Sequence, residues 1–197
     1  MGLAHVQRLL VELYTDAALR EQFFADPRAA CEVFRLSPNE AQQLGQLSSE
    51  QVGFFANSLR RKRLNAVGKL LPLTKRALGD YFAELFGQYA DSFMPSGTAK
   101  HRQDAIAFVA YIEEALSVHT TEPTRAVGLA RYEAAWLKAA DPTSRWIVCR
   151  LREPISRLVR CARHDAPSPR ATVALWFRLS PRSRLRHVVL SRPRLWQ

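Results

Sequence analysis

The residues of this sequence best suited to binding chemistry are the arginines near its C-terminus. Residues 142–197 contain 13 Arg and no Lys, and their only acidic residues are Glu153 and Asp165, so this segment carries 13 − 2 = +11, the whole formal net charge. The planar guanidinium fork of Arg binds carboxylate or phosphate through two hydrogen bonds. A segment this basic predicts an anionic partner, although a solvated basic surface would have the same composition.

Short β-strands are the elements expected to position these arginines. Three runs are rich in β-branched and aromatic residues, at residues 145–151, 171–179 and 185–190, and the first two alternate in polarity. Such runs are typical of short strands. The Ser-Pro-Arg-Ser sequence at residues 180–183 is a suitable connection for a hairpin between the last two runs, and a short helix is expected over residues 155–162.

The rim of this hairpin is the predicted binding site. Alternation along the strands places three arginines near the rim, namely Arg178, Arg184 and Arg186. An extended peptide could pair with an exposed strand edge there through main-chain hydrogen bonds, and the arginines would favour acidic sequences. The predicted peptide or partner site is completed by apolar residues of the middle strand: Val173, Leu175 and Trp176.

The same surface could instead bind nucleic acid, because positive charge does not distinguish a phosphate from a carboxylate. Trp176 and Trp196 would then offer faces on which bases could stack. An aromatic side chain beside a strand is, however, more often part of the core or a protection of the edge.

Capping signals indicate that the first 50 residues form short helices. Asp16, the pair Asp26-Pro27 and the Ser37-to-Glu40 capping box each mark the start of a short helix. The longest helix is expected to run from Ser49 to the residue before Pro72, with the basic run at residues 60–63 facing water.

Two more apolar stripes predict helices over residues 106–116 and 126–137. Glu133 falls on the second stripe, where it is either a buried carboxylate paired with an Arg or a helix-edge residue that reaches solvent. The predicted fold class is α+β, a mainly helical body with a small β-rich C-terminal portion. Three segments are expected: residues 1–50, residues 51–140, and the Arg-rich residues 141–197.

The usual catalytic and metal-binding motifs are missing from the sequence. It has no nucleophile elbow, no Gly-rich phosphate loop and no H-E-x-x-H zinc motif. His101 and Asp104 are one helical turn apart and could form a metal pair, but this spacing is common by chance. Cys149 and Cys161 are expected to be small buried residues rather than reactive thiols. No catalytic residue and no metal site are therefore predicted.

The compartment expected for this chain is the cytoplasm. The first residues lack the apolar region of a signal peptide, and no apolar stretch is long enough to span a membrane. The three cysteines are widely spaced and odd in number, which argues against a disulfide framework and suits a reducing environment.

The helical body resembles a bacterial family of accessory proteins. The resemblance rests on RRKRLNAVGKLLP at residues 60–72, on LTKRALGDYFAELFGQYADSFMP and DAIAFVAYIE after it, and on LARYEAAWLKA at residues 129–139. Proteins of this family are encoded beside multinuclear non-heme iron-dependent oxidative enzymes that modify ribosomally made peptides, and an older label for such domains is "putative DNA-binding". Residues 1–50 look like an added helical module.

The resemblance implies a non-catalytic partner protein that docks on a TIM-barrel iron enzyme and presents the leader of a precursor peptide to it. The iron would belong to the enzyme, so no cofactor is expected on this chain. Two alternatives remain open from the residues themselves. One is a DNA- or RNA-binding regulator that uses the C-terminal arginines, and the other is an independent oxygenase-like subunit that uses His101 or His119.

Overall fold

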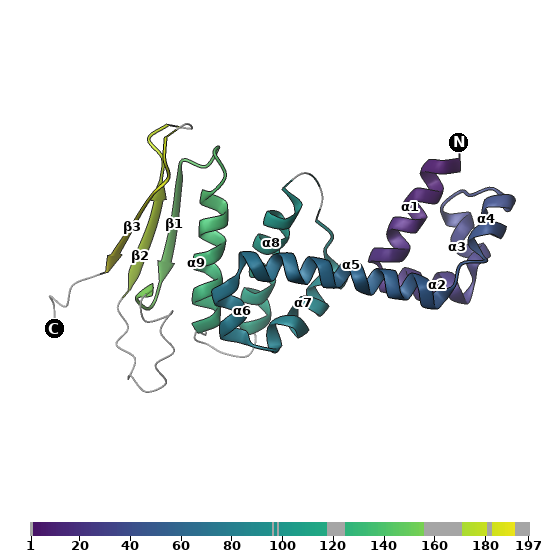
Figure 1. The fold of residues 1–197 in the computed structure, drawn as a ribbon, viewed down its shortest axis with the longest axis horizontal. Coiled ribbons are helices and arrows are strands. Elements are labelled where there is room, and N and C mark those ends of the chain that lie inside the picture. The colour runs from purple at the N-terminus through teal and green to yellow at the C-terminus, as the bar shows by residue number, and fades with distance from the viewer. Residues whose placement is uncertain are drawn as a thin grey trace. The chain divides into compact units, whose positions relative to one another are not determined.

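The chain is mainly helical and ends in a small antiparallel sheet. The computed structural model describes residues 2–95, 97, 99–117, 125–155, 171–180 and 183–191. Over these residues the helices are α1 (Gly2–Thr15), α2 (Ala17–Ala25), α3 (Pro27–Val33), α4 (Pro38–Leu44), α5 (Ser49–Leu70), α6 (Pro72–Leu78), α7 (Tyr81–Ser92), α8 (Lys100–Ser117) and α9 (Arg125–Ala139) (Figure 1). The strands are β1 (Trp146–Leu151), β2 (Thr172–Phe177) and β3 (Arg186–Ser191). The predicted α+β class is confirmed.

Local capping explains where the short N-terminal helices begin. The carboxylate of Asp16 accepts a hydrogen bond from the amide of Leu19 at 2.9 Å, and Asp26 caps α3. Ser37 and Glu40 form the expected capping box at the start of α4. Each bond satisfies a backbone amide that the first helical turn leaves without a partner. The helix starts predicted at these positions are therefore confirmed.

The chain contacts divide into two units, and each has its own core. The first unit consists of Met1–Asn65 and Gly87–Met94, and the second of Ala66–Phe86 and Pro95–Gln197. This division does not test which segments fold independently, so the domain boundaries predicted near residues 50 and 140 stay predictions.

The first unit surrounds an apolar cluster that includes the fully buried Leu9, Leu13 and Phe23. Part of the basic run at residues 60–63 is used within this unit, because Arg60 pairs with Asp91 and Arg63 donates to the carbonyl of Phe93 at 2.8 Å. Those two arginines therefore tie α5 to the C-terminal part of α7 and the residues after it instead of only facing water.

The second unit contains the sheet and helices that cover one of its faces. The strands are antiparallel in the order β1-β2-β3, with Cys149 opposite Ala174 and Trp176 opposite His187. Figure 1 shows α9 against one face of this sheet, and Trp176 and Leu129 belong to the core between them. The three predicted strands and the hairpin are confirmed. The helix predicted at residues 155–162 falls almost wholly outside the described residues.

Helix α9 also holds the start of α6, through Glu133. Its buried carboxylate accepts hydrogen bonds from the amides of Leu73 and Thr74, at 2.7 and 2.8 Å, and from the Thr74 hydroxyl at 2.6 Å. Amides at a helix N-terminus favour a negative charge. Of the two alternatives for Glu133, burial is correct, but the partner is the N-terminus of α6 and not an Arg. Within the described part of the chain, no helix is long and apolar enough to cross a bilayer.

Candidate functional site

The structure separates the three arginines of the predicted hairpin rim. The guanidinium of Arg178 is partly buried, and it donates to the carbonyls of Ser183 at 3.0 Å and Ala139 at 3.4 Å. These bonds hold the hairpin connection against the C-terminal end of α9. Arg184 and Arg186 are exposed. Two of the three arginines are thus available to a ligand, whereas Arg178 has a structural role.

The apolar residues predicted for the same site lie on opposite faces of β2. Trp176 is 1% exposed and packs against Tyr132, Trp136 and His187, so its ring has no face open to a base or a peptide. Val173 and Leu175 point to the other face of the sheet, where they are half-buried. Trp196 lies outside the described residues.

A groove of about 970 Å³ in the second unit is the candidate site. It is bounded by three elements. The lining residues come from α8 (Gln103, Ile106, Ala107, Val109, Ala110 and Glu113), from α9 (Arg131, Ala134, Ala135 and Lys138) and from β1 (Ile147, Val148, Cys149 and Arg150). Four alanines, two on each helix, leave the space that larger side chains would fill.

The groove runs along the outer edge of β1. It is lined by β1 residues from both faces of the sheet, such as Ile147 and Val148, and by none from β2 or β3. In the order β1-β2-β3, no described strand pairs with this edge. An unpaired strand edge is a template on which an extended chain can form main-chain hydrogen bonds.

The register indicates which backbone groups of β1 face the groove. The amide of Arg178 donates to the carbonyl of Arg145 at 3.0 Å, which makes these two residues a hydrogen-bonded pair. Such pairs alternate along an antiparallel ladder. The N–H and C=O groups of Trp146, Val148 and Arg150 therefore point away from β2, toward the outer edge. An added strand would find donors and acceptors at alternate residues of β1.

Charged side chains give the groove a net positive charge. Arg131 and Glu113 form an ion pair across its helical wall, with Nε and Oε2 3.0 Å apart. Lys138 and Arg150 add two more cations to the lining. With one acid against three bases, the groove carries a formal charge of +2, which favours an acidic ligand.

The thiol of Cys149 is not poised for chemistry although it lines the groove. Burial raises the pKa of this thiol, and the nearby Glu113 raises it further, against the opposing effects of Arg131 and Lys138. A thiol of raised pKa remains protonated at neutral pH, and the thiol is a much weaker nucleophile than the thiolate. Cys149 is buried, as predicted, and Cys161 lies outside the described residues.

His101, which was considered as a metal ligand, is not part of a metal site among the described residues. His101 is exposed on α8, whereas Asp104, one turn later, is fully buried. In the described ranges no three His, Cys, Asp or Glu side chains form a group that could hold a metal ion. His119 is outside those ranges.

Sequence reasoning located the sheet but missed the groove. In the sequence, the helical wall of the groove is marked only by Ala107 and Ala110 on α8 and by Ala134 and Ala135 on α9. Lys138 follows them at the end of α9. Small residues on two successive helices indicate a close approach or a recess, and this signal alone does not choose between them. The sequence pattern predicted strand β1, but it did not predict that β1 would be an edge strand of the sheet.

The comparisons with known proteins bear on the helical part of the chain. Residues 46–114 match the family model described as "SCO6045-like, C-terminal domain". The match covers less than half of the chain and extends from the residues before α5 to the last turn of α8. No curated protein matches the chain. The chain is thus similar, over these helices, to a family whose description states no activity.

Proposed function

We propose that this chain is a non-catalytic partner subunit of a multinuclear non-heme iron oxidative enzyme, and that it recognises the leader of a ribosomally made precursor peptide. The class of partner comes from the resemblance of residues 60–72 and 129–139 to the accessory family. The observation that carries the binding role is the groove along the outer edge of β1. The leader is proposed to bind there as an added strand.

The length of β1 suits such a ligand. Strand β1 has six residues, and an antiparallel partner of the same length would extend about 20 Å at roughly 3.4 Å per residue. Alternate side chains of the added strand would point toward the apolar wall of α8, near Ile106 and Ala110. The other side chains would lie beside Val148 and Arg150, on the face of the sheet away from α9.

Charge supports a preference for acidic leaders. The cations Lys138 and Arg150 line the groove, and Arg184 and Arg186 are exposed near the hairpin. An acidic peptide would be steered to this region, and main-chain hydrogen bonds to β1 would then supply affinity that does not depend on sequence. The peptide site proposed here is thus at the outer edge of β1, at the opposite side of the sheet from the outer edge of β3, and differs from the hairpin rim expected from the sequence.

The test is to fill the groove. Ala110 is an exposed α8 residue that lines it, so Ala110→Trp should occupy the space of the ligand without disturbing the core. Binding of the fluorescein-labelled leader of the precursor peptide from the same genome is measured by anisotropy. We expect the dissociation constant to rise at least about tenfold, or about 1.4 kcal/mol.

Ala83→Trp is the matched control, because Ala83 is an exposed helical alanine on α7 that is not part of the groove. Its dissociation constant should equal that of the unmodified protein. Equal affinities of the two variants would exclude the groove as the peptide site. A leader that does not bind the unmodified protein at all would contradict the recognition role itself.

A further inference from the structure

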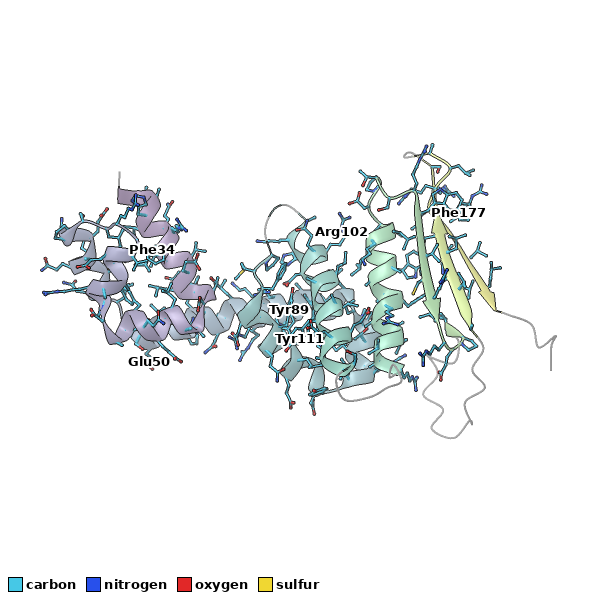
Figure 2. All side chains as sticks on the ribbon, turned by 180° about the vertical axis from the view of Figure 1, so that it is seen from behind. Phe34, Glu50, Tyr89, Arg102, Tyr111 and Phe177 are labelled. Atoms are coloured by element: carbon cyan, nitrogen blue, oxygen red, sulfur yellow. The ribbon has the colours of Figure 1, made fainter. Side chains whose placement is uncertain are left out.

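The face of the sheet that points away from α9 is a second candidate surface, here called the outer face. The strand register sets nine side chains on it in three rows. The rows are Trp146, Phe177 and Arg186; Val148, Leu175 and Val188; and Arg150, Val173 and Leu190. In Figure 2, Phe177 marks the hairpin end of this sheet.

The outer face is apolar although it is exposed. Trp146, Val148 and Leu190 are 61%, 58% and 59% exposed, and no described helix or strand covers the outer face (Figure 1). The Trp146 ring stacks on that of Phe177, with centroids 5.3 Å apart. An antiparallel sheet with one solvated face normally carries polar residues there. Seven apolar side chains among nine instead mark a surface that another molecule covers.

The charges on this face are of one sign. Its two polar residues, Arg150 and Arg186, lie at diagonally opposite corners, and neither pairs with a described acidic residue. Arg145, Arg152 and Arg184, all exposed, lie next to the strand ends. A complementary surface would be apolar at its centre and would carry carboxylates around it.

A second copy of the chain does not fit these features. Three strands of about 4.8 Å spacing and six residues of about 3.4 Å cover roughly 300 Å², so two stacked copies would bury about 600 Å² in total. Stable interfaces bury at least about 1,000 Å². Widening the contact would bring the arginines of one copy against those of the other, which is unfavourable.

A nucleic acid fits less well than a protein. Bases stack on aromatic rings, and the outer face presents one exposed ring, Trp146, whose one side is already covered by Phe177. The remaining apolar side chains are Val or Leu, which offer no flat surface for a base. Aliphatic side chains pack instead against the apolar core of a protein interface.

We infer that the outer face docks the catalytic partner of this chain, through an apolar patch on that enzyme that is bordered by Asp and Glu. This inference rests on the proposed function, and it assigns the enzyme and the peptide to different surfaces. The groove along β1 receives the leader, while β2, β3 and the outward side of β1 contact the enzyme. The peptide strand would then be held at the border of the enzyme interface.

The experiment compares two faces of one strand. Val188 and Val189 are neighbours on β3 and are both 40% exposed, but Val188 lies on the outer face and Val189 on the α9 side. Val188→Glu together with Leu190→Glu introduces charge on the outer face, and Val189→Glu is the control. Each full-length variant is co-expressed with the tagged multinuclear iron enzyme of the same genome, and the co-purified fraction is measured. Leader binding is measured in parallel by anisotropy.

We expect the outer-face variant to retain at most a tenth of the enzyme while its leader affinity changes less than threefold, and the control to retain both partners. A second variant, Leu190→Glu alone, changes one side chain that is 59% exposed and does not line the groove, and it should also lose most of the enzyme. This second variant tests the docking surface if circular dichroism shows that the double variant Val188→Glu with Leu190→Glu does not fold.

The outcomes separate this inference from the proposed function. Undiminished co-purification of both variants would overturn the inference and leave peptide recognition intact. If neither the enzyme nor the leader binds the unmodified protein, both proposals fail. A homodimer in light scattering that the outer-face substitutions abolish would replace the enzyme by a second copy. Tight binding of single-stranded RNA that is lost in the same variants would replace it by nucleic acid.

Discussion

The carboxylate of Glu133 on α9 accepts two hydrogen bonds from Thr74 on α6, from the amide at 2.8 Å and from the hydroxyl at 2.6 Å. Glu133 thereby links two helices whose contacting residues are 59 positions apart. The other side of α9 packs on the sheet. This buried contact therefore fixes the helix on which both the groove and the sheet depend.

Replacing Glu133 by Gln should destabilise the second unit strongly. The amide group brings a donor toward the amides of Leu73 and Thr74, and the charge that favours the helix N-terminus is lost. We expect the free energy of unfolding to fall by about 3 kcal/mol. Urea denaturation followed by circular dichroism measures it. Glu114→Gln, at an exposed position of α8, is the control. If both substitutions lower the free energy of unfolding by a similar small amount, Glu133 does not hold α6 and α9 together.

Arg178→Ala should reduce stability, whereas Arg184→Ala should not. Arg178 donates to Ser183 and Ala139, so its removal leaves two carbonyl groups near the end of α9 with fewer partners. The expected loss is about 1 to 2 kcal/mol, against less than about 0.5 kcal/mol for the exposed Arg184. Thermal melts of the two variants test this. If the two arginines contribute equally, the structural role of Arg178 is incorrect.

His187 should make the fold less stable in mild acid. The imidazole of His187 stacks on the Trp176 ring, with centroids 4.6 Å apart. Burial at this position lowers the pKa of the imidazole from its ordinary value of 6.5. The unfolded chain therefore takes up the proton first as the pH falls. The contribution of His187 is complete above pH 6.5 and is lost as the pH decreases from that value through the lower pKa of the folded state.

The measurement is the urea midpoint at pH 7.5 and pH 5.5. The midpoint of the unmodified protein should decrease more between these values than that of His187→Phe, whose ring can still stack but does not titrate. An identical pH response in the His187 variant would refute the assignment.

Binding of the leader should be sensitive to proline and only modestly sensitive to salt. A proline in the middle of the peptide removes an amide donor that would face β1, and the carbonyl left without a partner should cost about 1 to 3 kcal/mol. Salt weakens the attraction of Lys138 and Arg150 but not the main-chain bonds. Titrations with the proline variant, and at two ionic strengths, measure both effects.

The rival nucleic-acid function makes the opposite prediction. Binding through phosphates would decrease steeply with salt, with a log–log slope of about 0.9 for each neutralised duplex phosphate, and would not depend on a peptide backbone. Salt-steep binding to random duplex DNA, together with no affinity for a leader, would favour a regulator that uses Arg184 and Arg186.

The sequence by itself determined most of the secondary structure. Asp16, Asp26 and the pair of Ser37 and Glu40 cap helices that begin within three residues of them, so the signal and the structure that it controls are adjacent. The three strands were predictable for the same reason, because alternation is a property of neighbouring residues.

Only the tertiary structure decided which faces of these elements are buried and which distant residues are in contact. Both sets of alternating residues in β2 include apolar side chains, Ala174 and Trp176 beside Thr172 on one side and Val173 and Leu175 on the other, so the pattern did not decide which face α9 covers. The partner of Glu133 and the recess along β1 likewise depend on helices distant in sequence. Local hydrogen bonds are encoded within a few residues, whereas burial depends on which surfaces meet once the whole unit is packed.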